Sequence, residues 1–177
     1  GILYINDKDQ LKLSFYENTS LKISLGKNGQ PLEIPPIAFT NNDICSFAAC
    51  KKQIINIENV AECTNYDLSS VHTMDEMIGY HTKSMIVIPL VNHDNEVLGV
   101  LELFNPLDKD SNITSYTEEL EYSLYFFATQ ASVAISNITY KNETKELIHS
   151  FALVMSTAID ERSPYNANHT KHVAEYT

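Results

Sequence analysis

The stretch Ser84–Phe104 reads SMIVIPLVNHDNEVLGVLELF and carries the strongest strand signal in the chain. Its first part, Met85–Leu90, is nearly all apolar, which is typical of a strand covered on both faces. Asn92–Asn95 supplies a turn and Glu96–Phe104 returns, so the stretch predicts an antiparallel hairpin. Pro89 cannot donate to a central ladder, and we expect it at the strand's end or beside a bulge.

Shorter elements surround this hairpin. Apolar residues that alternate with polar ones predict strands at 1–5, 11–16, 21–25 and 54–57. A short helix is expected over Ile44–Lys52, capped by Asn42 or Asp43. About six mostly antiparallel strands with helices on the faces of the sheet predict an α+β fold.

Residues 59–78 are polar and irregular, with a helical turn expected over Ser69–Met77. A stretch of this length is either a binding lid or a cover over one edge of the sheet, and the sequence leaves both interpretations open. The candidate ligand-pocket residues are the aromatic, polar and thioether side chains on or near this stretch: Phe47, Tyr66, Asp67, His72 and Met77.

The region from Thr117 to Ile159 contains no glycine or proline and predicts one long helix, opened by a capping box of Ser115 and Glu118. Polar Thr139–Glu146 interrupts its apolar pattern. A connector between two domains explains the interruption, and two core helices joined by a polar turn are the alternative. The apolar residues at steps of three or four predict a homodimer through the Leu120–Ile138 helix, with a seam of Leu120, Leu124, Phe127, Ala131, Ala134 and Ile138.

Composition excludes several classes of partner. The net charge of −11 and pI near 4.8 argue against nucleic acid and against contact with an anionic membrane, because both require a basic surface. No apolar run approaches the roughly 20 residues that span a bilayer, and no signal peptide is visible. Cys45, Cys50 and Cys63 lack the spacing and even count of a disulfide framework. We expect reduced thiols and a cytoplasmic location.

The run Asp75–Leu90 (DEMIGYHTKSMIVIPL), followed by Glu96–Asn105 (EVLGVLELFN), resembles the signature hairpin of GAF domains. The resemblance implies that residues 1–138 form a GAF domain without its first helix. Members of this family bind cyclic nucleotides, haem, bilins or other small molecules between the sheet and a lid, or they bind nothing and only dimerise.

The final segment, Ala158–Glu175 (AIDERSPYNANHTKHVAE), resembles the opening of an HD-GYP domain, a metal-dependent phosphodiesterase. The expected division is therefore a GAF domain at 1–138, a helical linker at 139–157 and a truncated HD-GYP domain at 158–177. His169 would be a metal ligand in the full-length parent, which would use iron or manganese. No His-Asp pair follows before Thr177, so the resemblance implies no catalytic residue and no enzyme activity for this fragment.

The same resemblance narrows the ligand. Val71-His72 stands where bilin-binding relatives have Cys-His, so a covalent bilin is not expected. His72 or His81 could be an axial ligand of haem. The Lys–Asp pair of cyclic-nucleotide relatives is missing, because Asn105-Pro106 and Thr117-Glu118 occupy its positions. Cys45 and Cys50 do not match the reductases of free methionine sulfoxide. We therefore expect no cofactor in this fragment.

Two functional hypotheses remain open at this point. The first is a sensory, dimerising GAF domain that binds an unidentified small molecule and regulates a C-terminal HD-GYP phosphodiesterase acting on cyclic di-GMP in bacterial signalling. The alternative is a ligand-free GAF module that serves only oligomerisation.

Overall fold

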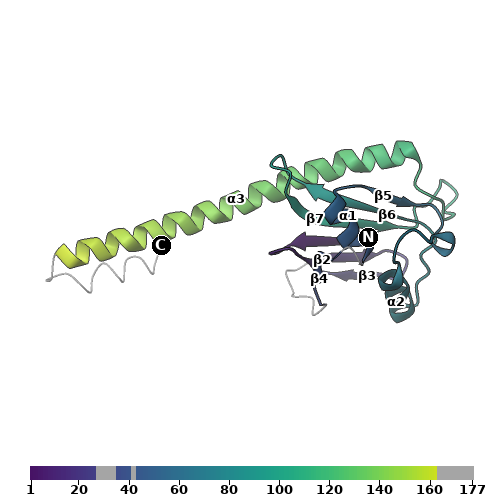
Figure 1. Ribbon diagram of the computed structural model, residues 1–177, viewed down its shortest axis with the longest axis horizontal. Coiled ribbons are helices and arrows are strands. Elements are labelled where there is room, and N and C mark those ends of the chain that lie inside the picture. The colour runs from purple at the N-terminus through teal and green to yellow at the C-terminus, as the bar shows by residue number, and fades with distance from the viewer. Residues whose placement is uncertain (27–34, 41–42, 163–177) are drawn as a thin grey trace. The chain divides into compact units, whose positions relative to one another are not determined.

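A computed structural model of the chain describes residues 1–26, 35–40 and 43–162. Its strands form one antiparallel sheet in the order β3-β2-β1-β7-β6-β5, with β4 paired to β2 (Figure 1). The predicted α+β fold is confirmed, and the short β4 is an addition to the six predicted strands. The strands are β1 Ile2–Asn6, β2 Gln10–Asn18, β3 Ile23–Leu25, β4 Ile37–Ala38, β5 Ile55–Ile57, β6 Met85–Val91 and β7 Val97–Phe104. The helices are α1 Ile44–Lys51, the 3-10 turn η1 Val60–Glu62, α2 Ser69–Ile78 and α3 Glu118–Arg162.

The predicted hairpin is the pair β6–β7 near the centre of the sheet. Pro89 pairs with Val100 of β7, whereas β5 pairs only with Met85–Val87, so the proline lies past the stretch that β5 covers. A register irregularity follows between Leu90 and Val91. The expectation that Pro89 lies beside a bulge is confirmed. Pro89 has no backbone N–H to donate, but β5 does not pair with this position, so no hydrogen bond to β5 is lost.

The two faces of the sheet are covered by different helices. Antiparallel partners carry their side chains on the same face, and a row of such partners runs across five strands against α1. On the other face, Asn56 of β5 donates from Nδ2 to the Tyr116 carbonyl oxygen (3.0 Å) and to Glu121 Oε2 of α3 (2.8 Å). The row on the α1 face consists of Ile55, Val87, Glu102, Ile2 and Tyr16.

Local capping residues fix where two helices begin. Asp43 caps α1, because its Oδ1 accepts from the backbone N–H groups of Cys45 (2.8 Å) and Ser46 (3.4 Å). Asn42, the other candidate, lies outside the described residues. For α3 the predicted capping box is wrong: the hydroxyl of Thr117 accepts from the Leu120 N–H (3.3 Å). Glu118 is the first helical residue and therefore comes too early for the third position that a capping box requires.

The long helix is confirmed as one uninterrupted element. α3 spans Glu118–Arg162, and the polar stretch 139–146 lies inside it, so the alternative of two helices joined by a turn does not hold. The chain divides into two compact units, Gly1–Val133 and Ala134–Thr177. The finer boundaries at 138 and 157 stay predictions. Residues 163–177, with most of the HD-GYP-like segment and His169, lie outside the described residues.

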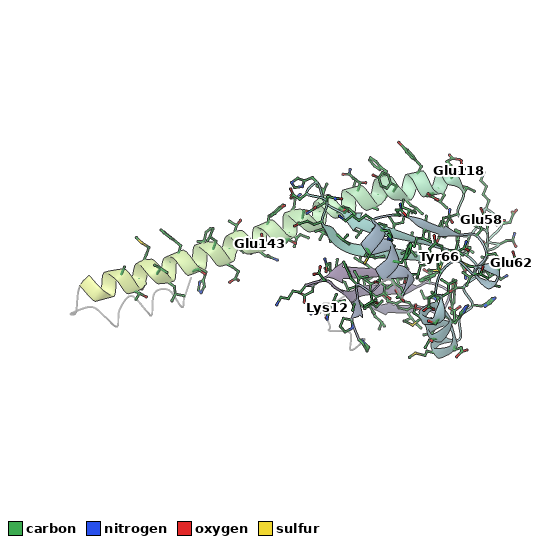
Figure 2. All side chains as sticks on the ribbon, in the orientation of Figure 1. Lys12, Glu58, Glu62, Tyr66, Glu118 and Glu143 are labelled. Carbon is green, nitrogen blue, oxygen red and sulfur yellow. The ribbon has the colours of Figure 1, made fainter. Side chains whose placement is uncertain are left out.

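Many acidic side chains of the chain are fully exposed. Glu58, Glu62 and Glu118 in the first unit, and Glu143 in the second, extend their carboxylates into solvent (Figure 2). Charges of this kind add little to folding stability, since water screens them. Within the described part of the chain, no helix has the length and apolarity that crossing a membrane requires.

Candidate ligand cavity

A cavity of about 600 Å³ lies in the first unit between the sheet, the start of α1 and α2. This volume falls in the range of small-molecule sites, about 300–1,000 Å³. β1 and β7 contribute its floor through Ile2, Tyr4 and Glu102, and α2 contributes a wall through Val71 and Ile78. The stretch that the sequence left open as a lid or an edge cover therefore forms one side of this cavity.

Glu102 is the most unusual residue of the floor. It lies opposite Ile2 in β1 and Val87 in β6, on the face that α1 covers, and is only 4% exposed. Burial raises the pKa of Glu102 to about 7, and the nearby Asp43 carboxylate raises it as well. A hydrogen bond with the Cys45 thiol lowers this pKa, but a thiol is a weak donor. The cavity therefore contains a carboxyl group that can change its charge near neutral pH.

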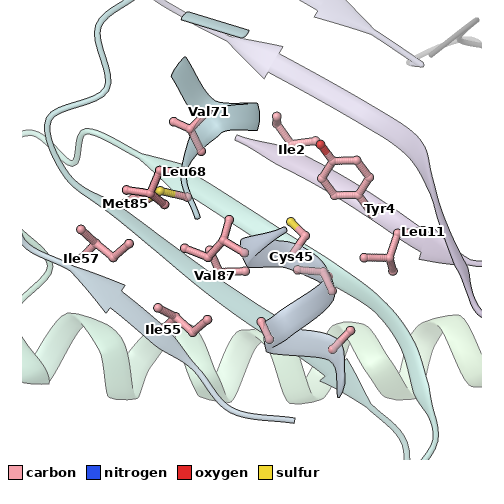
Figure 3. Packing of buried hydrophobic residues seen from close by; sticks show 14 of the residues in the cluster. Ile2, Tyr4, Leu11, Cys45, Ile55, Ile57, Leu68, Val71, Met85 and Val87 are labelled. Carbon is pink, nitrogen blue, oxygen red and sulfur yellow. The ribbon is translucent and has the colours of Figure 1, made fainter. Parts of the chain in front are cut away.

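Two tyrosines complete the polar part of the floor. Tyr4 is 8% exposed, and among the described residues its hydroxyl makes no hydrogen bond. Figure 3 shows this hydroxyl pointing toward Ile2 and away from Leu11. The Tyr16 hydroxyl also has no partner of normal hydrogen-bond geometry within the described chain. Burial raises the pKa of both phenols, with the charge of Glu102 adding to the rise for Tyr4 and Asn18 opposing it for Tyr16.

Backbone hydrogen bonds to two side chains hold the mouth of the cavity in place. Asp75 of α2 accepts from the Thr82 N–H (2.6 Å) and the Thr82 hydroxyl (2.9 Å). Asn105, at φ 49° after β7, accepts at Oδ1 from the N–H groups of Lys83 (2.7 Å) and Ser84 (3.2 Å). Its Nδ2 donates to the His81 carbonyl oxygen (2.8 Å) and to the Tyr80 hydroxyl (3.0 Å). The loop between α2 and β6 is thus fastened to the end of β7.

The structure gathers none of the five predicted pocket residues at this cavity. Phe47 and Tyr66 instead pack edge to face, with ring centroids 5.4 Å apart. Asp67 is exposed and accepts from the Ser69 N–H (3.0 Å) at the start of α2. His72 and Met77 lie on the exposed side of α2, where Met77 is 77% exposed. A ligand pocket at these five residues stays a prediction, and we propose the cavity as the ligand pocket in its place.

Sequence reasoning missed Glu102, Tyr4 and Cys45. One signal was present: Glu102 is a charged residue within the otherwise apolar strand VLGVLELF. A carboxylate in such a run either faces solvent or is buried for a functional reason, and only the folded structure shows which of these holds.

The other residues weighed as ligand-binding groups occupy varied places. His81 lies at the cavity and is exposed, whereas His72 does not line it. The Asn105 side chain accepts a hydrogen bond from the loop between α2 and β6, and the Thr117 hydroxyl caps α3. Cys45 is buried, Cys50 is exposed, and Cys63 is half-buried; all three are free thiols. No group of three His, Cys, Asp or Glu side chains in the described ranges could hold a metal ion.

Comparison with known proteins places the fold. The sequence profile of the GAF domain family matches residues 2–135. A dual 3',5'-cyclic-AMP and -GMP phosphodiesterase 11A from Takifugu rubripes is 34% identical over 82 residues, which cover 46% of this chain and 9% of that protein. This chain therefore matches under a tenth of that relative's length.

Solved structures agree on the fold alone. The GAF domain of a phosphoenolpyruvate-protein phosphotransferase from Coxiella burnetii superposes with a TM-score of 0.56 at 16% identity, covering 80% of this chain and 74% of that one. A methyl-accepting chemotaxis protein gives a TM-score of 0.53 at 20% identity, covering 78% of each chain. With its antiparallel sheet, its cavity beside α2 and a family match over most of its length, this chain belongs to the GAF domain family.

Proposed function

We propose that this chain is a sensory GAF domain that binds a small molecule in the cavity beside α2 and regulates a phosphodiesterase domain that follows it. The observation that carries the sensory part is the cavity itself: about 600 Å³, floored by a buried carboxyl group and by the Tyr4 hydroxyl, which has no hydrogen-bond partner among the described residues. Buried polar groups are normally satisfied, so unsatisfied ones in a cavity favour a bound ligand.

The phosphodiesterase part of the proposal rests on the sequence. Residues 158–175 resemble the opening of an HD-GYP domain, and one relative of the GAF part is named as a phosphodiesterase. In the full-length parent, His169 would be the first ligand of an iron or manganese site, and cyclic di-GMP would be the substrate. Such a metal would supply a bound hydroxide that attacks the phosphodiester.

Hydrolysis by the full-length parent tests this output. With manganese added, that protein is expected to hydrolyse cyclic di-GMP, and His169→Ala should abolish hydrolysis because it removes a metal ligand. His149→Ala is a matched control on the exposed surface of α3 and should leave hydrolysis unchanged. A downstream sequence without a His-Asp pair, or full activity of His169→Ala, would overturn the phosphodiesterase part and leave the sensory part standing.

Dimerisation is proposed through α3. Its exposed apolar side chains recur at seven-residue intervals, which is the repeat by which two copies of one helix pair. Two of the six residues of the predicted seam, Leu124 and Ala131, are partly buried within the first unit and are less available to a second copy. The exposed heptad positions are Phe126 (58%), Val133 (52%), Tyr140 (45%), Leu147 (71%) and Val154 (66%). We take these residues, which we call the heptad stripe, as the contact with a second copy.

Light scattering after size exclusion tests the heptad stripe. The wild-type chain is expected to be a dimer, and the double variant Phe126→Glu, Leu147→Glu is expected to be a monomer because each copy would bury charges against its twin. Asn142→Glu adds a charge about opposite to Phe126 on the helix and should remain dimeric. A monomeric wild type, or a dimer that survives the double variant, would contradict this contact.

The rival function is a ligand-free module that serves only oligomerisation, and the exposed heptad stripe favours it as much as it favours sensing. Native mass spectrometry of the protein purified from cells separates the two. A retained small molecule, lost on denaturation, supports sensing, whereas a protein mass without any addition supports the oligomerisation module.

A further inference from the structure

The charged groups around the cavity are nearly all acidic. Its lining contains four carboxylates and, within the described chain, no lysine or arginine. The basic groups there are His81, which is exposed, and the amine of Gly1, which donates to the Glu17 carbonyl oxygen (2.6 Å). The four carboxylates belong to Glu17, Asp43, Asp75 and Glu102. A phosphate or carboxylate ligand would meet like charge on four side chains here, and among the described residues the Gly1 amine is the main cation placed to offset it.

The carboxylates differ in how fully the protein satisfies them. Asp43 accepts two backbone N–H groups of α1, and Asp75 accepts two hydrogen bonds from Thr82. Glu102, by contrast, is 4% exposed, and among the described residues the Cys45 thiol is its only side-chain donor. A buried carboxylate with a single weak donor retains most of its capacity to accept hydrogen bonds. The Glu17 side chain also makes no hydrogen bond within the described chain, but it is only half-buried, so Glu102 is the buried carboxylate left for a ligand.

A second, independent observation points to the same place. Tyr4 lines the cavity, is more than nine-tenths buried, and has a hydroxyl without a hydrogen-bond partner among the described residues. The charges of Glu102 and Cys45 both raise the pKa of this phenol, and all three residues line the same cavity. This hydroxyl is not fully enclosed by protein, so it opens to the cavity and is available to a ligand with a polar end.

Beside polar residues such as Asn18, Ser70 and Thr82, the cavity has an apolar part. Ile2 and Phe104 of the sheet face Val71 and Ile78 of α2 across the cavity. A ligand that fits must therefore combine a hydrocarbon or aromatic body with one cationic end that donates hydrogen bonds.

We propose that the cavity binds an organic cation of the aryl- or alkylammonium class, whose N–H groups donate to the Glu102 carboxylate and the Tyr4 hydroxyl while its apolar body packs against Val71 and Phe104. This proposal rests on the proposed sensory function and names the ligand class for the same site. It also predicts that the site discriminates against cyclic nucleotides, whose phosphate is anionic.

Three small probes of matched size test the ligand class: phenethylammonium, the neutral 2-phenylethanol and the anionic phenylacetate, each titrated by calorimetry into the full chain. Phenethylammonium is expected to bind about tenfold or more tightly than either isostere, because a charge-assisted hydrogen bond to a buried carboxylate adds that much. Cyclic AMP and cyclic GMP are titrated in parallel and are expected not to bind.

Variants place the binding in the cavity. Glu102→Gln should weaken phenethylammonium about tenfold or more and should reduce its preference over phenylacetate. Tyr4→Phe should weaken it by a smaller factor without disturbing the fold, since the lost hydroxyl has no protein partner. Glu76→Gln, an equal change of charge on the exposed side of α2, should bind like the wild type.

Each outcome decides something. Three results overturn the cation proposal. Phenylacetate binds as tightly as phenethylammonium or more tightly, or Glu102→Gln leaves the binding of phenethylammonium unchanged. The third is that phenethylammonium does not bind at 10 mM, roughly the weak limit of specific binding. If a cyclic nucleotide binds, or if an anionic molecule is retained in native mass spectrometry, the ligand class is wrong but the sensory function stands. If nothing binds and nothing is retained, the sensory function itself fails.

Discussion

Replacing Glu102 with Gln tests the buried carboxyl group through stability, independently of any ligand. In the folded protein, burial raises the pKa of Glu102 from 4.5 to about 7; Asp43 raises it further, and the Cys45 thiol and the Gly1 amine lower it. The folded chain therefore binds more protons than the unfolded chain between about pH 4.5 and 7. Its free energy of unfolding must fall as the pH rises through this window, because the folded state then contains a buried charge.

The magnitude follows from the shift. Each pKa unit corresponds to about 1.36 kcal/mol, so ionisation of Glu102 removes about 3 kcal/mol of stability by pH 8. Gln has nearly the same shape, can accept from the Cys45 thiol and carries no charge. The variant Glu102→Gln is therefore expected to exceed the wild type by about 3 kcal/mol at pH 8 and to equal it near pH 4.

Urea unfolding followed by circular dichroism at pH 4 and pH 8 measures this difference, since linear extrapolation gives the free energy of unfolding at each pH. Glu76→Gln is the matched control, because Glu76 is exposed on α2 and is expected to behave as the wild type at both values. The reasoning is refuted if Glu102→Gln is no more stable than the wild type at pH 8, because Glu102 would then be ionised at no cost.

Three further predictions concern the frame around the cavity. Asn105→Ala removes four hydrogen bonds and leaves two backbone N–H groups at the start of β6 without acceptors, so it should cost about 3 kcal/mol in urea unfolding; a loss below about 1 kcal/mol would contradict that role. Gly99→Ala would place a Cβ 2.2 Å from the Tyr4 carbonyl oxygen. β1 must then move away from β7, which should cost about 2 kcal/mol of folding stability. A thermal midpoint equal to that of the wild type would refute this close approach. Asp43→Ala removes the cap of α1 and should cost about 1 kcal/mol of folding stability at pH 4. At pH 8 it also removes the repulsion between the Asp43 and Glu102 carboxylates, which should offset part of this loss. An equal or larger loss at pH 8 would contradict the interaction of the two carboxylates.

Much of the fold could be predicted because its signals are local. The alternation of β2, the apolar run of β6 and the turn between β6 and β7 each lie within a few residues of one another in the sequence. The cap of α1 by Asp43 is equally local. The start of α3 was misjudged by two residues, since a hydroxyl at Ser115 and another at Thr117 match the same short motif and only the helix geometry selects between them.

The cavity could not be predicted in the same way. The sequence predicted a ligand pocket at Phe47, Tyr66, Asp67, His72 and Met77, because an irregular polar stretch suggested a lid. α2 does form a wall of the cavity, but a helix presents only one side to it, and Val71 and Ile78 occupy that side. The rotation of α2 about its axis depends on packing against the sheet, which a weak apolar pattern over ten residues does not specify.

By itself the sequence determined the kinds and order of the elements, since hydrophobic periodicity, turns and caps act over a few residues. Only the tertiary structure decided which chemistry the cavity contains. Glu102, Tyr4 and Cys45 come from β7, β1 and α1, and the register that sets Ile2 opposite Glu102 brings them to one face of the sheet. Since a shift of one residue in that register would turn the carboxylate to the other face, its burial is a property of the assembled sheet and cannot be read from the strand alone.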